Sequence, residues 1–238
     1  MRTFTRLLRL DLTLQARSFL YPATVVSTAM ICGFILLIPT RPLPPQLTAL
    51  FVFMDPAIIG LSFVGAMVLM EKAQGTLFAL GVTPVESGAY VAAKTVSLTT
   101  LTFASSFVVV LVATRGAFDP LRGIIAVALS STVVVLIGLI CVARAASMNH
   151  LLATLLWVTT LLYLPLLDRF DILPGFLTPL VALIPSYAML LLLEASADAG
   201  SVALMAQAGS ALFLAAWVWV GWRRTVREFV DMLVTEGR

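Results

Sequence analysis

Two places in this chain of 238 residues carry side chains that could do chemistry. Asp55, which precedes Pro56, interrupts a long apolar stretch, where a carboxylate can take up a proton or mark a substrate path. The second place begins at Glu71 and ends at Lys94, EKAQGTLFALGVTPVESGAYVAAK, where polar side chains keep returning between apolar ones. What either place can do depends on the elements that position it.

Motifs for covalent chemistry are absent from the sequence. It contains no GxxxxGK[ST] loop for a nucleotide phosphate, no HExxH, no GxSxG, and no second intramembrane aspartate to pair with Asp55. His150 has no ligand partner at metal spacing, and Cys32 and Cys141 lie in apolar runs, which is typical of buried structural cysteines. The sequence therefore predicts no catalytic residue, no metal and no cofactor bound by this chain, which is not expected to be an enzyme. Its basic residues lack the aromatic interleaving of a nucleic-acid site.

The composition predicts an integral membrane protein, because 61% of the residues are hydrophobic and only 11% are charged. A spanning helix needs roughly 20 apolar residues. The predicted fold class is an all-α polytopic membrane protein, with one transmembrane domain over residues 1–238. The six expected spans cover residues of about 21–39, 49–70, 84–114, 121–144, 151–167 and 202–222.

Asp55 falls about two turns inside the outer end of the predicted span 49–70. Burying a carboxylate at the centre of a bilayer costs about 2.5–3.5 kcal/mol on insertion scales, and less near the interface. Two interpretations remain open. Asp55 is either a polar point on a substrate path or outer gate, or a residue near enough to the outer surface to be hydrated, where Pro56 loosens the helix.

The first 20 residues are too polar to span a membrane and predict an amphipathic interfacial helix. Only Asp11 breaks the pattern. In one interpretation the helix lies on the cytoplasmic surface, with its arginines near anionic head groups; in the other, Asp11 also pairs with a neighbouring loop or a partner subunit. The polar arc consists of Arg2, Arg6, Arg9, Thr13 and Arg17.

The chain must turn between the second and third spans. Thr83, Pro84 and Glu86 have the spacing of a capping box, with proline at the first helical position, so a helix is expected to begin near Pro84. Before it, residues 73–80 can form a short helix that ends at Gly81. A short helix exposed between two spans is well shaped for docking.

Residues 168–200 contain two apolar runs separated by Pro185 and Ser186, and neither run alone can span. Joining them would give seven spans and place the arginine-rich carboxy terminus outside. We therefore expect a re-entrant hairpin over about 172–195 that forms part of an outer vestibule, rimmed by Asp168, Asp171, Glu194 and Asp198. Pro185 and Tyr187 join Asp55 and Pro56 as candidates for the substrate path. Most basic residues lie on the side of both termini, which predicts cytoplasmic termini.

The run from Asp55 to Lys94 resembles the type-2 permeases of ATP-binding cassette (ABC) transporters, and most of all those of the fluoroquinolone-export kind. In that pattern an acidic and a basic residue are followed by T-[LI], TP, an aromatic residue and AK. The segments RLDLTLQAR and LIPSYAMLLLLEA are also similar. The pattern's residues are here Glu71, Lys72, Thr76, Leu77, Thr83, Pro84, Tyr90, Ala93 and Lys94.

The resemblance implies a permease subunit with a cytoplasmic coupling helix between spans two and three and a re-entrant segment before span six. Such permeases work in pairs, with ATP and Mg bound by separate ATP-binding subunits. The residues expected to couple to the ATPase are Glu71, Lys72, Gly75, Thr76, Leu77, Gly81, Thr83, Pro84 and Glu86.

The sequence and the resemblance together predict the membrane subunit of an exporter of drug-like or lipid-like amphipathic molecules in the bacterial plasma (inner) membrane. Its expected partners are an ABC ATP-binding subunit, a second permease of the same or a sister chain, and membrane lipids. Three alternatives stay open: a heme-exporter-type membrane subunit, a membrane anchor that transports nothing, and a proton-coupled secondary transporter.

Overall fold

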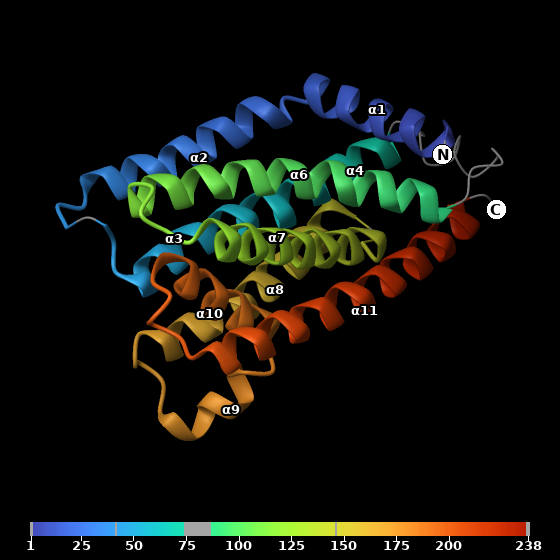
Figure 1. The fold of residues 1–238 in the computed structure, drawn as a ribbon. Helices are drawn as coiled ribbons and strands as arrows, with labels where there is room; N and C mark the ends of the chain where they lie inside the picture. Colours follow the sequence, from blue (N-terminus) through green and yellow to red (C-terminus); the bar gives the residue numbers. More distant parts are fainter. Residues whose placement is uncertain (1, 41, 74–86, 146, 237–238) are drawn as a thin grey trace.

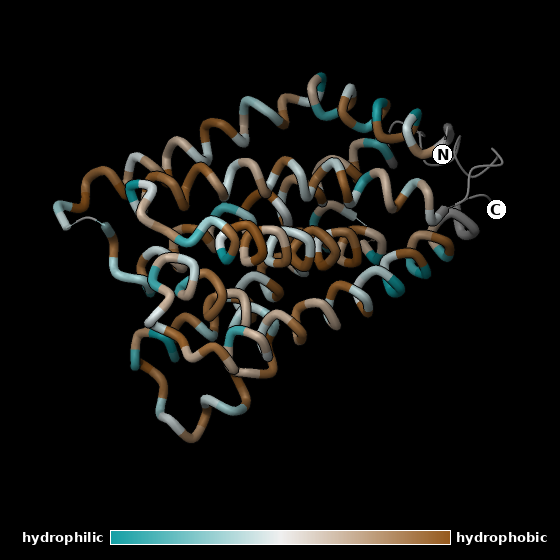
Figure 2. Tube along the Cα trace, viewed as in Figure 1, coloured by the Kyte–Doolittle hydropathy of each residue, from teal (hydrophilic) through white to brown (hydrophobic). Residues whose placement is uncertain are grey.

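The computed structural model describes residues 2–40, 42–73, 87–145 and 147–236, and within these ranges all regular structure is helical. Six helical stretches are long and apolar enough to cross a membrane, as the sequence predicts. Figure 1 shows them as one elongated bundle, and Figure 2 shows how apolar residues dominate its length. The stretches are Leu20–Leu37, Pro45–Glu71, Gly88–Thr114, Pro120–Ala143, Met148–Arg169 and Leu204–Met232.

The bundle is built around α7 (Pro120–Ala143), which packs against α6 (Ser87–Thr114) and α11 (Leu204–Glu236). Asp119 caps the start of α7, where its carboxylate accepts hydrogen bonds from the backbone N–H groups of Leu121 and Arg122 at 3.0 and 3.2 Å. Ser147 caps α8 (Met148–Arg169) in the same way. Polar caps thus fix where these two spans begin.

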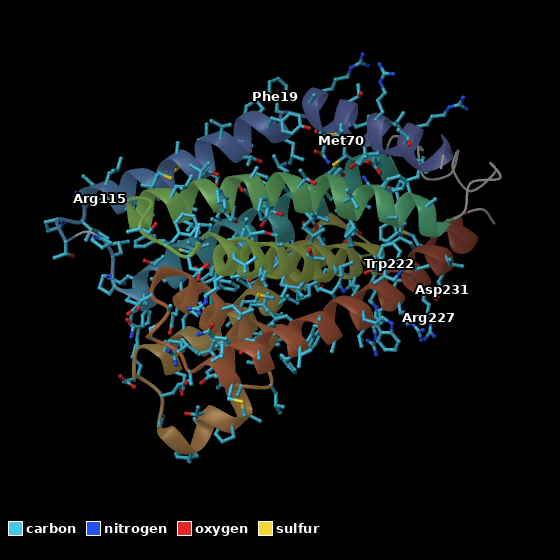
Figure 3. The ribbon with its side chains drawn as sticks, viewed as in Figure 1. Phe19, Met70, Arg115, Trp222, Arg227 and Asp231 are labelled. Carbon is cyan, nitrogen blue, oxygen red and sulfur yellow. The ribbon has the colours of Figure 1, made fainter. Side chains whose placement is uncertain are left out.

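Two helices precede the second span. The amphipathic α1 (Arg2–Arg17) packs against α6, and it joins α2 (Leu20–Leu37) through Phe19, whose φ of 58° bends the chain. Both termini lie at the same end of the bundle (Figure 1), as expected for six spans. Figure 3 shows Arg115 at the opposite end from Arg227 and Asp231. Which end faces the cytoplasm stays a prediction.

The second span is not one regular helix. It consists of α3 (Pro45–Pro56), a π-helical stretch η1 (Ala57–Phe63) and α4 (Val64–Ala73). Pro56 has no N–H to donate, so the regular hydrogen-bond ladder is interrupted where η1 begins. Gly138 of α7 crosses η1 so closely that a Cβ atom there would lie 2.4 Å from the carbonyl oxygen of Gly60.

The region before the last span is broken, roughly as predicted. A short turn η2 (Gly175–Leu177) and α9 (Thr178–Val181) precede α10 (Pro185–Ala197), and the helical segments on either side of the break meet at 101°. Helix α10 is mostly buried against α3, α7 and α11. The predicted vestibule rim is wrong for Glu194, which is 1% exposed and forms a bidentate ion pair with Arg169 of α8.

Helix α11 is longer than predicted, because it continues beyond residue 222 to Glu236. The extension is amphipathic, and it buries Phe229 and Met232. The ring of Phe229 packs 5.8 Å from the ring of Tyr90 in α6. Arg144, at the end of α7, forms an exposed ion pair with Glu228 of the same extension. Packing at this end of the bundle therefore extends the helix past its apolar part.

Candidate functional site

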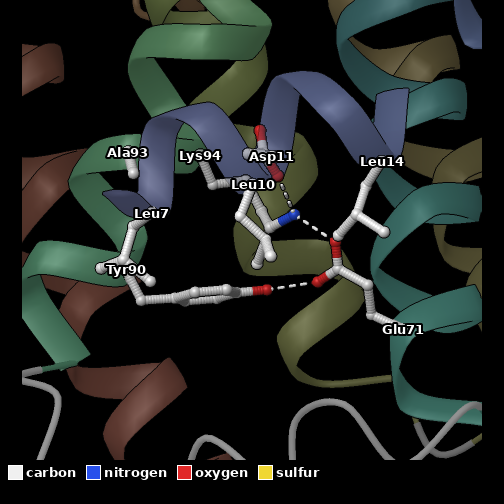
Figure 4. Close-up of a pocket in the computed structure, with 8 residues that line it drawn as sticks. All are labelled: Leu7, Leu10, Asp11, Leu14, Glu71, Tyr90, Ala93 and Lys94. Carbon is white, nitrogen blue, oxygen red and sulfur yellow. Dashed lines mark hydrogen bonds and ion pairs between the residues drawn. The ribbon is translucent and has the colours of Figure 1, made fainter. Parts of the chain in front are cut away.

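A cluster of three charged side chains is buried where α1, α4 and α6 meet (Figure 4). The ammonium group of Lys94 lies 2.8 Å from Asp11 Oδ1 and 2.6 Å from Glu71 Oε1. Lys94 is 1% exposed, and each carboxylate residue is 5% exposed. Buried charges are tolerated only when they are paired and hydrogen-bonded, and here one cation serves two anions.

Neutral donors satisfy the remaining carboxylate oxygens. Tyr90 Oη donates to Glu71 Oε2 at 2.5 Å, and Gln15 Nε2 donates to Asp11 Oδ2 at 2.9 Å. The hydroxyl of Ser97 bonds to Asp11 as well, and Gln15 Nε2 lies 3.0 Å from the same hydroxyl. The excess negative charge of the cluster is thus shared among hydroxyl and amide donors.

Helical spacing explains how the cluster assembles. Asp11 and Gln15 lie four residues apart on the face of α1 that meets α6. Tyr90, Lys94 and Ser97 follow at the same kind of spacing on one face of α6, and Glu71 lies in the last turns of α4. Each of three helices contributes charged or polar groups, so the cluster joins them at one point. We call these six residues the Lys94 cluster.

The Lys94 cluster corrects one expectation, the partner of Asp11. Asp11 pairs with a lysine of a transmembrane helix in its own chain, not with a loop or a partner subunit. Lys94, which follows the polar stretch near the start of a predicted span, is buried among α1, α4 and α6. The cluster contains four residues to which the sequence analysis assigned no role: Lys94, Tyr90, Gln15 and Ser97. The shared helix face of Tyr90, Lys94 and Ser97 could have indicated a common site.

Most of the predicted ATPase-coupling residues lie outside the described residues. Glu71 is described, and the backbone of Lys72 belongs to α4. Those outside are Gly75, Thr76, Leu77, Gly81, Thr83, Pro84 and Glu86, together with the expected short helix over 73–80 beyond Ala73 and the capping box. Glu71 and Lys94 flank this stretch in the sequence and meet in the structure.

A further buried carboxylate is that of Asp55, whose exposed fraction is 0%. Thr28 Oγ1 of α2 donates to Asp55 Oδ1 at 2.9 Å, while the hydroxyls of Ser105 and Ser106 of α6 donate to Oδ2 at 2.5 and 2.9 Å. Among the described residues, no lysine or arginine forms an ion pair with Asp55. We call these four residues the Asp55 cluster.

The burial of Asp55 disfavours the hydrated interpretation, because none of its side chain is exposed. Asp55 lies about 15 Å along the helical stretch that begins at Pro45. Thr28 and Ser105 also line an open, apolar groove of about 500 Å³ between α2 and α6. A role of Asp55 on a substrate path stays a prediction.

The other predicted path residues lie elsewhere. Pro56 is buried at the end of α3. Pro185 is buried at the first turn of α10 and Tyr187 is half-buried, and neither lines the groove between α2 and α6. Helix α10, which carries Pro185 and Tyr187, packs against α3, which carries Asp55 and Pro56, and a shared place on a substrate path stays a prediction.

The predicted interfacial arginines of α1 are exposed where their side chains are described, namely at Arg6, Arg9 and Arg17. The side chain of Arg2 lies outside the described residues. Contact of these arginines with lipid head groups stays a prediction. Within the described ranges, no three histidine, cysteine, aspartate or glutamate side chains gather in a way that could hold a metal ion.

The chain is similar in sequence to known proteins over most of its length. The family model of the fluoroquinolones export permease proteins matches residues 2–236. Two relatives, the fluoroquinolones export permease proteins of Mycobacterium tuberculosis strains CDC 1551 and H37Rv, are each 34% identical over 200 residues, which cover 82% of this chain and 81% of each relative. No solved structure matches the chain. A bundle of six apolar helices that matches this family over nearly its whole length is a membrane permease, and the chain belongs to the fluoroquinolones export permease protein family.

Proposed function

We propose that this chain is the transmembrane permease subunit of an ATP-binding cassette exporter. It moves an amphipathic, drug-like or lipid-like substrate across the bacterial plasma membrane by alternating access. A separate ATP-binding subunit binds ATP and Mg and supplies the energy, and a second permease completes the pathway. Family membership and the six apolar spans support this proposal.

The observation that carries the proposal is the Lys94 cluster. Residues 74–86 connect α4 to α6, and the ion pair between Glu71 and Lys94 ties the two helices together on either side of that connection. Asp11 adds α1 to the same point. A displacement applied to residues 74–86 would therefore move α4 and α6 as one unit, which is what coupling to an external ATPase requires.

The cluster also gives α1 a role in coupling. Its inward face is tied to Lys94 and Ser97, while Arg6, Arg9 and Arg17 on its other side are exposed. Basic side chains of an amphipathic helix bind anionic head groups. We propose that α1 holds the coupling end of the bundle at the cytoplasmic surface while the spans move.

The test replaces residues 74–82 with a glycine–serine segment of the same length in the complex with the ATP-binding subunit. The variant should insert into the membrane normally but lose substrate-stimulated ATPase activity. The matched control replaces residues 198–201, in the exposed connection between α10 and α11, and should keep that activity. Full stimulation in the 74–82 variant would place the coupling contact elsewhere.

A proton-coupled secondary transporter is the second candidate function, because Asp55 is a carboxylate buried within one of the six apolar stretches. This candidate requires transport by the purified chain alone, driven by a pH gradient. Transport that stops when the ATP-binding subunit is omitted would exclude it.

A further inference from the structure

The groove between α2 and α6 is mostly apolar, but three hydroxyl residues, Thr24, Thr28 and Ser105, are part of its lining. Its apolar lining includes Val25, Leu101 and Val108. Its volume of about 500 Å³ falls within the range typical of small-molecule sites, about 300–1,000 Å³. Because α2 packs mainly on α6 with few other neighbours, the groove opens on the side of the bundle.

Thr28 and Ser105 connect the groove to Asp55. Both hydroxyls donate to the Asp55 carboxylate, so their oxygen lone pairs remain available to accept hydrogen bonds. A ligand N–H at the floor of the groove would lie about two hydrogen-bond lengths, or about 5–6 Å, from the carboxylate. The carboxylate accepts hydrogen bonds from three hydroxyls, which stabilise its ionised form, whereas burial of the group favours its neutral form.

The carboxylate of Asp55, where it is ionised, has no cation of its own among the described residues. Within the described part of the chain, its polar partners are hydroxyls alone, whereas the carboxylates of Asp11, Glu71 and Glu194 all have a lysine or arginine partner. A buried charge attracts an opposite charge strongly where the surroundings are apolar. When Asp55 is ionised, the cation that complements it would therefore have to come from outside the described part of the chain, and a ligand in the groove can supply it.

We propose that the groove between α2 and α6 binds an apolar molecule that carries one protonated amine, whose charge is recognised by Asp55 through Thr28 and Ser105. This inference rests on the proposed export function and specifies its substrate class. The apolar body of the ligand lies along the groove, and its ammonium group donates to the two hydroxyls. A lipid acyl chain or a second copy of this chain would need no charge at this depth.

The experiment uses monodansylcadaverine, which has an apolar fluorophore and a primary amine, and its N-acetyl derivative, which is neutral. Fluorescence titration of the detergent-purified chain gives the Kd of each probe without any ATPase. We expect the wild-type protein to bind the amine at least about tenfold more tightly, the size of one charge-assisted interaction. Asp55→Asn should abolish this preference, because it should weaken binding of the amine probe and leave the affinity for the neutral probe unchanged.

A second variant tests whether the probes bind in the groove between α2 and α6. This test remains valid even if the Asp55→Asn protein does not fold. Ala104 lines the groove and is exposed, so Ala104→Leu should fill part of it and weaken binding of both probes. Ala216→Leu, at an exposed position of α11, should bind both probes like the wild type. Equal affinity of the wild type for the two probes, or an Ala104→Leu protein with unchanged affinities, would overturn the inference.

Transport measured in membrane vesicles distinguishes a failure of this inference from a failure of the proposed function. Failure of the ATP-driven complex to move the amine probe, although the wild-type chain binds it selectively, would contradict the export function and leave the site intact. ATP-driven transport of the neutral and the amine probes at equal efficiency, with no effect of Asp55→Asn, would contradict the site and leave the function intact.

Discussion

The Lys94 cluster and the Asp55 cluster both bury carboxylates in the same bundle, but they neutralise them differently. Asp11 and Glu71 share the ammonium group of Lys94, which comes from the chain itself. Asp55 is surrounded by hydroxyls from α2 and α6 and has no cation among the described residues. A charge that is paired within the protein fastens helices together, whereas a charge without a counterion is available to a ligand.

The two clusters also lie at different depths. The Lys94 cluster lies at the end of the bundle where residues 74–86 connect α4 to α6, and Asp55 lies near the middle of its span. This separation agrees with the two proposed roles, in which the Lys94 cluster transmits movement and the Asp55 cluster recognises the transported molecule. Three substitutions test whether the difference holds, and they are ordered by expected effect.

Lys94→Met should have the largest effect. It leaves Asp11 and Glu71 buried without a cation, and breaking a buried ion pair in this way costs about 3–5 kcal/mol. The loss can be measured as a lower free energy of unfolding in a denaturant titration in detergent micelles.

The matched control for Lys94→Met is Arg144→Met. Arg144 also pairs with a glutamate, but its side chain is 55% exposed, so its loss should cost less than about 1 kcal/mol. Equal effects of the two substitutions would show that the buried ion pairs of the Lys94 cluster do not hold α1, α4 and α6 together.

Gly138→Ala should come second. The new Cβ atom would lie 2.4 Å from the carbonyl oxygen of Gly60, so the π-helical stretch that follows Asp55 must shift, at a cost of about 1–3 kcal/mol. The unfolding titration measures this loss too. Gly209→Ala in α11 is the control, because a Cβ atom there would meet nothing within 4 Å. Wild-type stability of both alanine variants would contradict the close approach of α7 to η1.

Asp55→Asn should have the smallest effect on stability. Asparagine keeps one carbonyl acceptor, and the hydroxyls can rotate to accept from its amide, so the change should not exceed about 0.5–1.5 kcal/mol. Thermal unfolding of Asp55→Asn beside Lys94→Met makes the comparison directly. A loss as large as that of Lys94→Met would mean that Asp55 is a structural joint as well.

The sequence predicted the number of spans because spanning depends mainly on local apolar composition. It predicted the end of the last helix less well: residues 223–236 are polar enough to look like a tail, but Phe229 and Met232 pack against the bundle and extend the helix. Composition alone does not show that contact.

The surroundings of individual charges were harder to predict. A lysine at the start of an apolar segment is typical of an interfacial residue, and the packing of α1 and α4 around this part of α6 buries Lys94. The hydrogen-bond donors of Asp55 are the hydroxyls at positions 28, 105 and 106. Hydroxyl residues are too common in these helices for the sequence to single out these three. Both clusters depend on long-range helix contacts that no local pattern contains.

The most direct test of the account measures ATP-dependent accumulation of substrate in inverted membrane vesicles that contain this chain and its ATP-binding subunit. The account predicts accumulation that requires ATP hydrolysis and persists after the pH gradient is collapsed. Accumulation without the ATP-binding subunit, and its loss when the pH gradient is collapsed, would contradict the assignment of this chain as an ATP-driven permease.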